Sequence, residues 1–321
     1  MIFYIITFII SIIILAWLSS KILNSLMSLA KYLGWREFVI AFFIMSIAGS
    51  LPNLLVGFNS VWRGMPEIAF GDIIGGNLVD LTLVMALAVF MSKKSIPAES
   101  KMIQYSAIFT GVIGLLPLLL ILDGILSRSD GFILIFAFLS YTLWIFSKDD
   151  RFKKTYQQEN QNPVKNFYNF IGNIGKIILF LGILLIASQF IVDSAKYFSI
   201  YFGAPLSLVG LLVVGLGNCF PEAYFSVVSA RRGEGWLILG DLMGSVISAA
   251  SLILGLIAIV IPFQINDFSP FLIARIFFIA AIFLFIIFVK TGHKVTKKEG
   301  IILLFVYILF LLVEIFNSYI S

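Results

Sequence analysis

Apolar runs of about twenty residues, separated by short polar or turn-rich segments, organise the whole chain. A helix that crosses a bilayer needs roughly 20 mostly apolar residues, so each run is long enough to be a membrane span. The ten runs lie near residues 2–22, 37–61, 66–91, 103–123, 131–147, 170–193, 205–230, 236–262, 270–290 and 300–319. The first run is predicted to be a retained span, because it has neither the basic start nor the small-residue cleavage site of a signal peptide.

The longest polar interruption, Lys148 to Asn166, divides these runs into five plus five. We therefore expect a first five-helix repeat over residues 1–147, a cytoplasmic linker over 148–169 and a second five-helix repeat over 170–321. The predicted fold class is an all-α polytopic membrane protein with ten transmembrane helices in two inverted repeats.

Composition supports a membrane protein: 60% of the 321 residues are hydrophobic and 12% are charged, against about 25% charged residues in a soluble domain. The net charge of +5 does not indicate a nucleic-acid partner, because the basic residues gather on one side of the predicted spans. Eighteen of the 22 Lys and Arg residues fall on that side, and the other side receives Arg63, Arg128, Lys196 and Arg275. Basic residues mark cytoplasmic loops, so both termini are predicted to be extracellular in a cell membrane. No obligate protein partner is indicated.

The two halves align without a gap at an offset of 169 residues. The matched pairs include Pro52 with Pro221, Arg63 with Arg232, Gly71 with Gly240, Asp72 with Asp241 and Gly75 with Gly244. An odd number of spans in each half makes the repeats antiparallel, as in secondary transporters that bind their substrate near the midplane.

Two spans contain a proline beside glycine and polar residues, at 48–53 and at 217–222. Proline removes a backbone donor and clashes with the preceding turn, so both spans are expected to be interrupted there. Carbonyl groups freed at membrane depth are tolerated where they line a cavity or are buried in protein. They could therefore contribute to a cation site. The alternative is a simple proline kink.

Three carboxylates, Asp72, Glu222 and Asp241, lie within predicted spans that hold no basic partner. Ionisable groups at this depth are costly and mark functional sites, so these three are expected to need a bound cation. Oxygen ligands suit Ca²⁺. A transition-metal site would need several Cys or His ligands, and the chain has one of each, Cys219 and His293. Asp80, two turns after Asp72, is either a second cation or proton station or a hydrogen-bonded structural residue.

The segments Gly71–Asn77 and Gly240–Val246 resemble the repeated Gly-Asn/Asp-x-x-Gly-Ser-Asn motif of the Ca²⁺/cation antiporter superfamily, which includes the sodium/calcium exchangers and proton-coupled relatives. The resemblance implies a non-enzymatic antiporter that exchanges Ca²⁺ for Na⁺ by alternating access and holds no cofactor. Where sodium-coupled prokaryotic members have Glu, Asn, Glu and Asp, this chain has Asn53, Asp72, Glu222 and Asp241.

The hydroxyl groups that the family offers to Na⁺ are largely replaced here, by Gly49, Asn218 and Cys219. Coupling to H⁺, or another divalent cation as substrate, therefore stays open beside Na⁺/Ca²⁺ exchange. The candidate cation ligands are Gly49, Ser50, Asn53, Asp72, Asn77, Gly217, Asn218, Glu222, Asp241 and Ser245.

Three other classes compete with the exchanger. A ten-helix carrier of the drug/metabolite type would leave the buried carboxylates without a use. A membrane prenyl transferase would need Asp-rich clusters for Mg²⁺-diphosphate, and none lies in any span. A cation channel would conduct ions without strict coupling between two fluxes, so a demonstration of strict coupling would exclude it.

Overall fold

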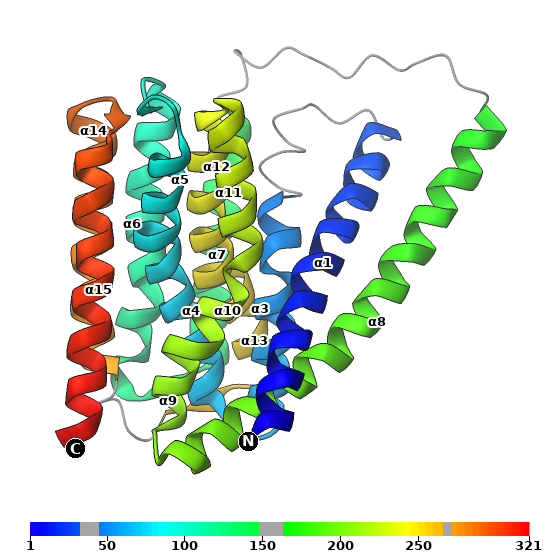
Figure 1. Ribbon diagram of the computed structural model, residues 1–321. Helices are drawn as coiled ribbons and strands as arrows, with labels where there is room; N and C mark the ends of the chain where they lie inside the picture. Colours follow the sequence, from blue (N-terminus) through cyan, green and yellow to red (C-terminus); the bar gives the residue numbers. More distant parts are fainter. Residues whose placement is uncertain (33–44, 148–162, 266–270, 321) are drawn as a thin grey trace.

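The computed structural model describes residues 1–32, 45–147, 163–265 and 271–320. Most of these residues form long helices that stand side by side (Figure 1). Eight are long and apolar enough to cross a membrane, and their bounds are Pro66–Met91, Lys101–Asp123, Arg128–Ile145, Gly172–Phe202, Leu206–Arg232, Gly235–Val260, Leu272–Thr291 and Lys297–Asn317. The protein is therefore an integral membrane protein with an all-α polytopic fold.

The first half contains five of the predicted runs. Helix α1 spans Ile2–Tyr32 and α3 spans Met45–Trp62; α4 (Pro66–Val79), a π-helical segment η2 (Asp80–Val84) and α5 (Met85–Met91) form one continuous rod. Helix α6 (Lys101–Leu120) ends in the 3-10 turn η3 (Ile121–Asp123), and α7 covers Arg128–Ser147. The part of the second predicted span before residue 45 lies outside the described residues.

The second half contains the other five. Helix α8 runs over Pro163–Phe202; the next rod consists of α9 (Leu206–Val209), η5 (Gly210–Val214), α10 (Gly215–Asn218) and α11 (Phe220–Arg232). It is followed by α12 (Gly235–Ile247), η6 (Ser248–Ile253) and α13 (Leu254–Val260), and then by α14 (Leu272–Thr291) and α15 (Lys297–Ile320). Helix α8 is longer at both ends than the predicted run 170–193.

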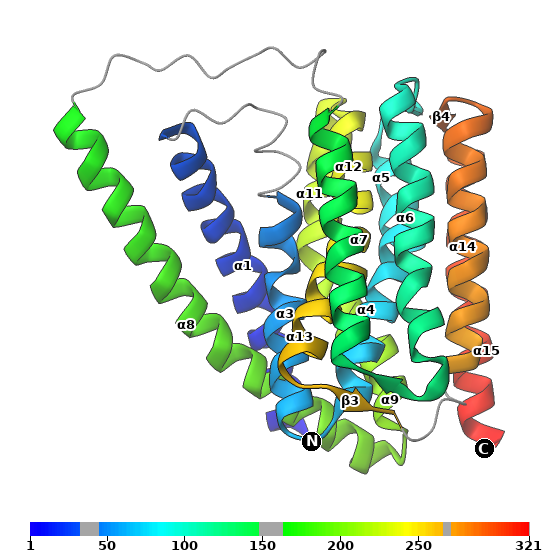
Figure 2. The ribbon, with the colours of Figure 1, turned by 180° about the vertical axis from the view of Figure 1, so that it is seen from behind.

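Two short antiparallel strand pairs join loops from the two halves. Strand β1 (Ile96–Pro97) pairs with β4 (Lys294–Val295), with Ile96 opposite Val295. Strand β2 (Ile125–Leu126) pairs with β3 (Phe263–Gln264), with Ile125 opposite Gln264. Each pair ties a helix end of one half to a helix end of the other (Figure 2 shows β3 and β4).

The two predicted helix interruptions have different outcomes. The rod from Leu206 breaks at Cys219, where the ψ of 1° leaves the helical range and α11 restarts with Pro221 in its first turn. The other prediction is wrong, because α3 continues through Pro52 as one helix. A proline can remain inside a membrane helix where neighbouring groups satisfy the backbone that its ring disturbs.

Candidate cation-binding site

Glycine residues allow α4 to cross η5 and α10 with their backbones in contact. A Cβ on Gly71 would lie 2.9 Å from the amide nitrogen of Leu211, and one on Gly215 would lie 2.8 Å from the amide nitrogen of Gly76. Small residues at such crossings let membrane helices approach closely. The crossing brings Asp72 of α4 beside Asn218 of α10, which come from different halves of the chain.

Asp72 accepts two hydrogen bonds from the Asn218 amide, at 2.9 Å to Oδ1 and 3.0 Å to Oδ2. Asp72 is fully buried and Asn218 is 4% exposed. This pair of predicted ligands is therefore in direct contact. The Asn218 Oδ1 atom has no hydrogen-bond partner among the described residues and stays available to a cation.

Asp80, whose role the sequence left open, lies at the junction of the two halves. Its carboxylate interacts with the Ser245 hydroxyl of α12 and with the Cys219 thiol. The same thiol donates to the carbonyl oxygen of Gly76, at 3.3 Å between sulfur and oxygen. Asp80 is 2% exposed, and its Oδ1 has no partner within the described structure. The structure thus adds Asp80 and Cys219 to the site.

Glu222 reaches from the first turn of α11 to α3. Its Oε1 lies 3.0 Å from the position that a Cβ on Gly49 would occupy, so the glycine leaves room for the carboxylate. Glu222 is 5% exposed, and its Oε2 lacks a hydrogen-bond partner in the described chain. Asn53, one turn beyond Gly49 on α3, is also buried and has an unpartnered Oδ1.

Among the four carboxylates, Asp80 and Glu222 form a central pair, and Asp72 and Asp241 flank it. Glu222 is within electrostatic range of Asp80, Asp241 and Asp72, and Asp241 is within range of Asp80. Asp72 and Asp241 each lie six residues after the start of their span. Asp72 and Asp80 are eight residues apart on one rod, or about 12 Å along a helix axis. Within the described residues no Lys or Arg forms an ion pair with any of the four.

Unsatisfied polar atoms gather along this part of the protein. Buried polar groups almost always have a hydrogen-bond partner, so a group of exceptions marks a place for a ligand. Among the described side chains the exceptions on α3, α4, η2, α10, α11 and α12 are Asn53 Oδ1, Asn77 Nδ2, Asp80 Oδ1, Asn218 Oδ1, Glu222 Oε2, Ser226 Oγ and Asp241 Oδ2. Six of the seven are oxygens, the atoms that hard cations bind.

Two other predicted ligands are Ser50 and Gly217. Ser50 is fully buried on α3, and Gly217 faces Ile12 of α1 with no room for a side chain. In the described chain no three Asp, Glu, His or Cys side chains converge closely enough to hold a metal by themselves. A cation here would need amide, hydroxyl and backbone oxygens as well as carboxylates. The sequence left the role of Asp80 open, because a carboxylate two turns after Asp72 can be either a second cation or proton station or a hydrogen-bonded structural residue.

The fold and the site define a membrane transporter. The family model described as sodium/calcium exchanger protein matches residues 3–147 and 173–316, and the chain belongs to this family. The expected superfamily is therefore confirmed, and it is a family of transporters.

Individual relatives match nearly the whole chain. The putative antiporter CaxA of Alkalimonas amylolytica is 25% identical over 307 residues, covering 93% of this chain and 94% of that protein. The sodium/calcium exchanger MaX1 of Methanosarcina acetivorans is 24% identical over 354 residues, covering 92% and 93%. A solved structure of the sodium-calcium exchanger NCX_Mj, soaked with Na⁺ and Sr²⁺, superimposes with a TM-score of 0.66 at 23% identity and covers 96% and 97%. This last likeness supports the fold.

Proposed function

We propose that the protein is a secondary antiporter that exchanges Ca²⁺ for Na⁺ at a site built around Asp80 and Glu222. The observation that carries this proposal is a set of buried carboxylates from both halves, without a basic partner in the described chain. The central pair can neutralise one Ca²⁺ or two monovalent cations. The same oxygens would bind either Ca²⁺ or the monovalent ions. Binding of one therefore excludes binding of the other, as exchange requires.

The proposed ligand set extends the sequence prediction by Asp80. Asp72 and Asp241 flank the central pair, and oxygens of Asn53, Asn218, Ser50 and Ser245 complete the coordination with carbonyl groups near Gly49 and Gly217. Asn77 supports the site from α4. Ca²⁺ accepts six to eight oxygens in flexible geometry, which suits a site assembled from several helices.

We further propose ten spans in two inverted repeats, with α1 and α3 completing the eight helices described above and both termini outside the cell. Two features support the repeats. The π-helical segments Asp80–Val84 and Ser248–Ile253 nearly coincide at the 169-residue offset, and so do the strands Ile125–Leu126 and Lys294–Val295. Segments of π-helix are frequent at functional sites.

Coupling to H⁺ is the second candidate. It is favoured by the replacement of family hydroxyl groups with Gly49, Asn218 and Cys219, which leaves fewer oxygens for Na⁺. The description of the family and the name of MaX1 favour Na⁺.

Ca²⁺ uptake into proteoliposomes tests the proposal, driven first by an outward Na⁺ gradient and then by an outward H⁺ gradient. We expect uptake with the Na⁺ gradient, and its loss in Glu222→Gln and Asp241→Asn. Uptake with the H⁺ gradient alone would transfer the assignment to the second candidate. Absence of Ca²⁺ flux under both gradients, with protein that is folded by its thermal transition, would refute Ca²⁺ exchange.

A further inference from the structure

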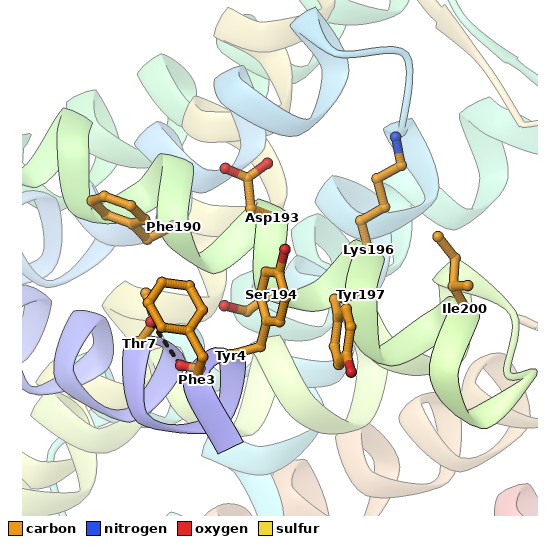
Figure 3. A pocket seen from close by; sticks show the side chains of 9 residues that line it. All are labelled: Phe3, Tyr4, Thr7, Phe190, Asp193, Ser194, Lys196, Tyr197 and Ile200. Carbon is orange, nitrogen blue, oxygen red and sulfur yellow. Dashed lines mark hydrogen bonds between the residues drawn. The ribbon is translucent and has the colours of Figure 1, made fainter. Parts of the chain in front are cut away.

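A pocket of about 360 Å³ lies between the N-terminal end of α1 and the C-terminal part of α8 (Figure 3). Its volume falls within the range of about 300–1,000 Å³ that is usual for small-molecule sites. None of the residues that line it belongs to the candidate cation site. The pocket therefore needs an occupant of its own.

The α8 side of the pocket is one face of a helix. Residues spaced three or four apart on a helix share a face, and those that line the pocket from α8 include Phe190, Asp193, Tyr197 and Ile200. Tyr4 of α1 stacks on Tyr197, with ring centroids 4.0 Å apart. A wall that combines aromatic rings with a carboxylate is suited to a cationic group.

The pocket lies at a surface that faces lipid. Phe3 of α1 and Ile200 of α8 line it and are 68% and 73% exposed, and the neighbouring Ile2 and Ile6 of α1 are exposed as well. Large apolar side chains on the outside of a membrane protein contact acyl chains, whereas a long charged side chain reaches toward the head groups. Lys196, which is exposed, supplies that charged end. The pocket thus meets both parts of a lipid.

Two opposite charges line the pocket, those of Asp193 and Lys196. In Figure 3 their charged ends lie on the same side of the Tyr4 and Tyr197 rings. The ion pair of Asp193 with Arg63 uses Oδ1 of the carboxylate, so Oδ2 can accept a hydrogen bond from a ligand. Lys196 forms no ion pair within the described residues. A ligand that matches both groups carries a cation and an anion on one short molecule.

A buried hydroxyl group completes the polar lining. Ser194 is fully buried, and its Oγ has no hydrogen-bond partner in the described part of the chain. By contrast, the Thr7 hydroxyl donates to the carbonyl oxygen of Phe3 at 2.7 Å and is satisfied by its own helix. Buried polar groups almost always have a partner. The Ser194 hydroxyl is therefore free to donate to an oxygen of a bound molecule.

We propose that this pocket binds the head group of a phospholipid of the ethanolamine type, with its ammonium at Asp193 and its phosphate at Lys196 and Ser194. A primary ammonium has N–H groups to donate to the carboxylate, whereas a quaternary ammonium has none and needs open aromatic faces. Tyr4 and Tyr197 cover one face of each other. The proposal is independent of the ion that the protein transports.

Native mass spectrometry of the purified full chain in detergent tests the proposal. Dioctanoyl lipids with ethanolamine, choline and glycerol head groups are titrated separately, and water-soluble phosphoethanolamine is titrated beside them. We expect the ethanolamine lipid to bind more tightly than each of the other three. Equal affinity for the choline or the glycerol lipid would overturn the head-group assignment. Equal affinity for phosphoethanolamine would overturn a lipid as the occupant.

Substitutions in the pocket locate the binding. Ser194→Ala removes only the buried hydroxyl and should weaken binding of the ethanolamine lipid about two- to tenfold, the range of one hydrogen bond. Lys196→Ala should weaken it about two- to fivefold, as for an exposed ion pair, and Lys196→Arg should keep the parent affinity. The control Lys290→Ala removes an exposed lysine that does not line the pocket and should also keep it.

Parent affinity in both Ser194→Ala and Lys196→Ala would overturn the pocket as the binding site. An equal loss in Lys290→Ala would assign the effect to overall charge and would also overturn it. The thermal transition of each variant without added lipid separates a lost site from a lost fold. Because Lys196 is exposed, its two variants decide the question even if Ser194→Ala does not fold.

Discussion

Replacing Gly75 by alanine should weaken the crossing on which the site is built. A Cβ at this position would lie 2.8 Å from both the Cα and the carbonyl carbon of Leu211 and would overlap the Leu211 carbonyl oxygen. Carbon atoms in contact are about 3.5–4.0 Å apart, so the two backbones must separate by roughly 1 Å. No rotamer change can relieve the overlap, because every atom concerned belongs to the backbone.

Overpacking of this kind costs about 1–3 kcal/mol. A destabilisation of 1 kcal/mol lowers the thermal midpoint by about 2–4 °C in domains of 150–250 residues, so we expect the midpoint of this 321-residue chain to fall by roughly 2–12 °C. The separation also moves Asp72 away from Asn218, whose hydrogen bond is 2.9 Å long. Ca²⁺ uptake should therefore fall even at temperatures where the variant is folded.

The measurement is the thermal transition of purified protein in detergent, followed by the fluorescence of its five tryptophans. Gly240→Ala is the matched control, because Gly240 is the repeat counterpart of Gly71 and a Cβ there meets no atom within 4 Å. This control should unfold at the parent temperature or slightly above it, since alanine is favoured over glycine inside a helix by about 0.5–1 kcal/mol. Equal midpoints for Gly75→Ala and the control would refute the close crossing.

Three further predictions concern the site and the topology. Asp80→Asn should abolish Ca²⁺ uptake while leaving the thermal midpoint within a few degrees of the parent, and full uptake by this variant would exclude Asp80 from the site. Gly49→Ala should raise the KM for Ca²⁺ several-fold with little loss of stability, because the new Cβ displaces only the flexible end of Glu222; an unchanged KM would contradict that contact. In right-side-out vesicles, a membrane-impermeant thiol reagent should modify Arg128→Cys and leave Lys294→Cys unmodified, and the reverse result would invert the proposed orientation.

Much of the fold could be predicted from the sequence alone. A bilayer requires about twenty apolar residues for each spanning helix, so the span Pro66–Met91 was predicted at the bounds that the structure gives. The break beside Pro221 was predicted correctly, and the repeated glycine and aspartate motifs indicated the family. These features depend on local composition or on matches at a fixed offset, which need no knowledge of packing.

The choice among carboxylates depended on tertiary structure. Asp80 meets Ser245 and Cys219 only because α4 and η2 pack against rods that follow more than a hundred residues later. Its spacing from Asp72 along the chain left its role open between a cation or proton station and a structural residue. At Pro52 the sequence predicted a helix break that the structure does not have. The local preference of proline for a break is outweighed there by the neighbours that surround α3.

The sequence by itself therefore determined that the chain crosses a membrane and which family it resembles, and it predicted related halves and a cation bound by the buried acidic residues. Tertiary structure decided which acidic side chains lie within electrostatic range of one another and where α8 contacts α3. The physical reason is that hydrophobic length and residue identity are properties of each segment. In contrast, the electrostatic field and the contacts around a buried charge depend on helices that come together only when the chain folds.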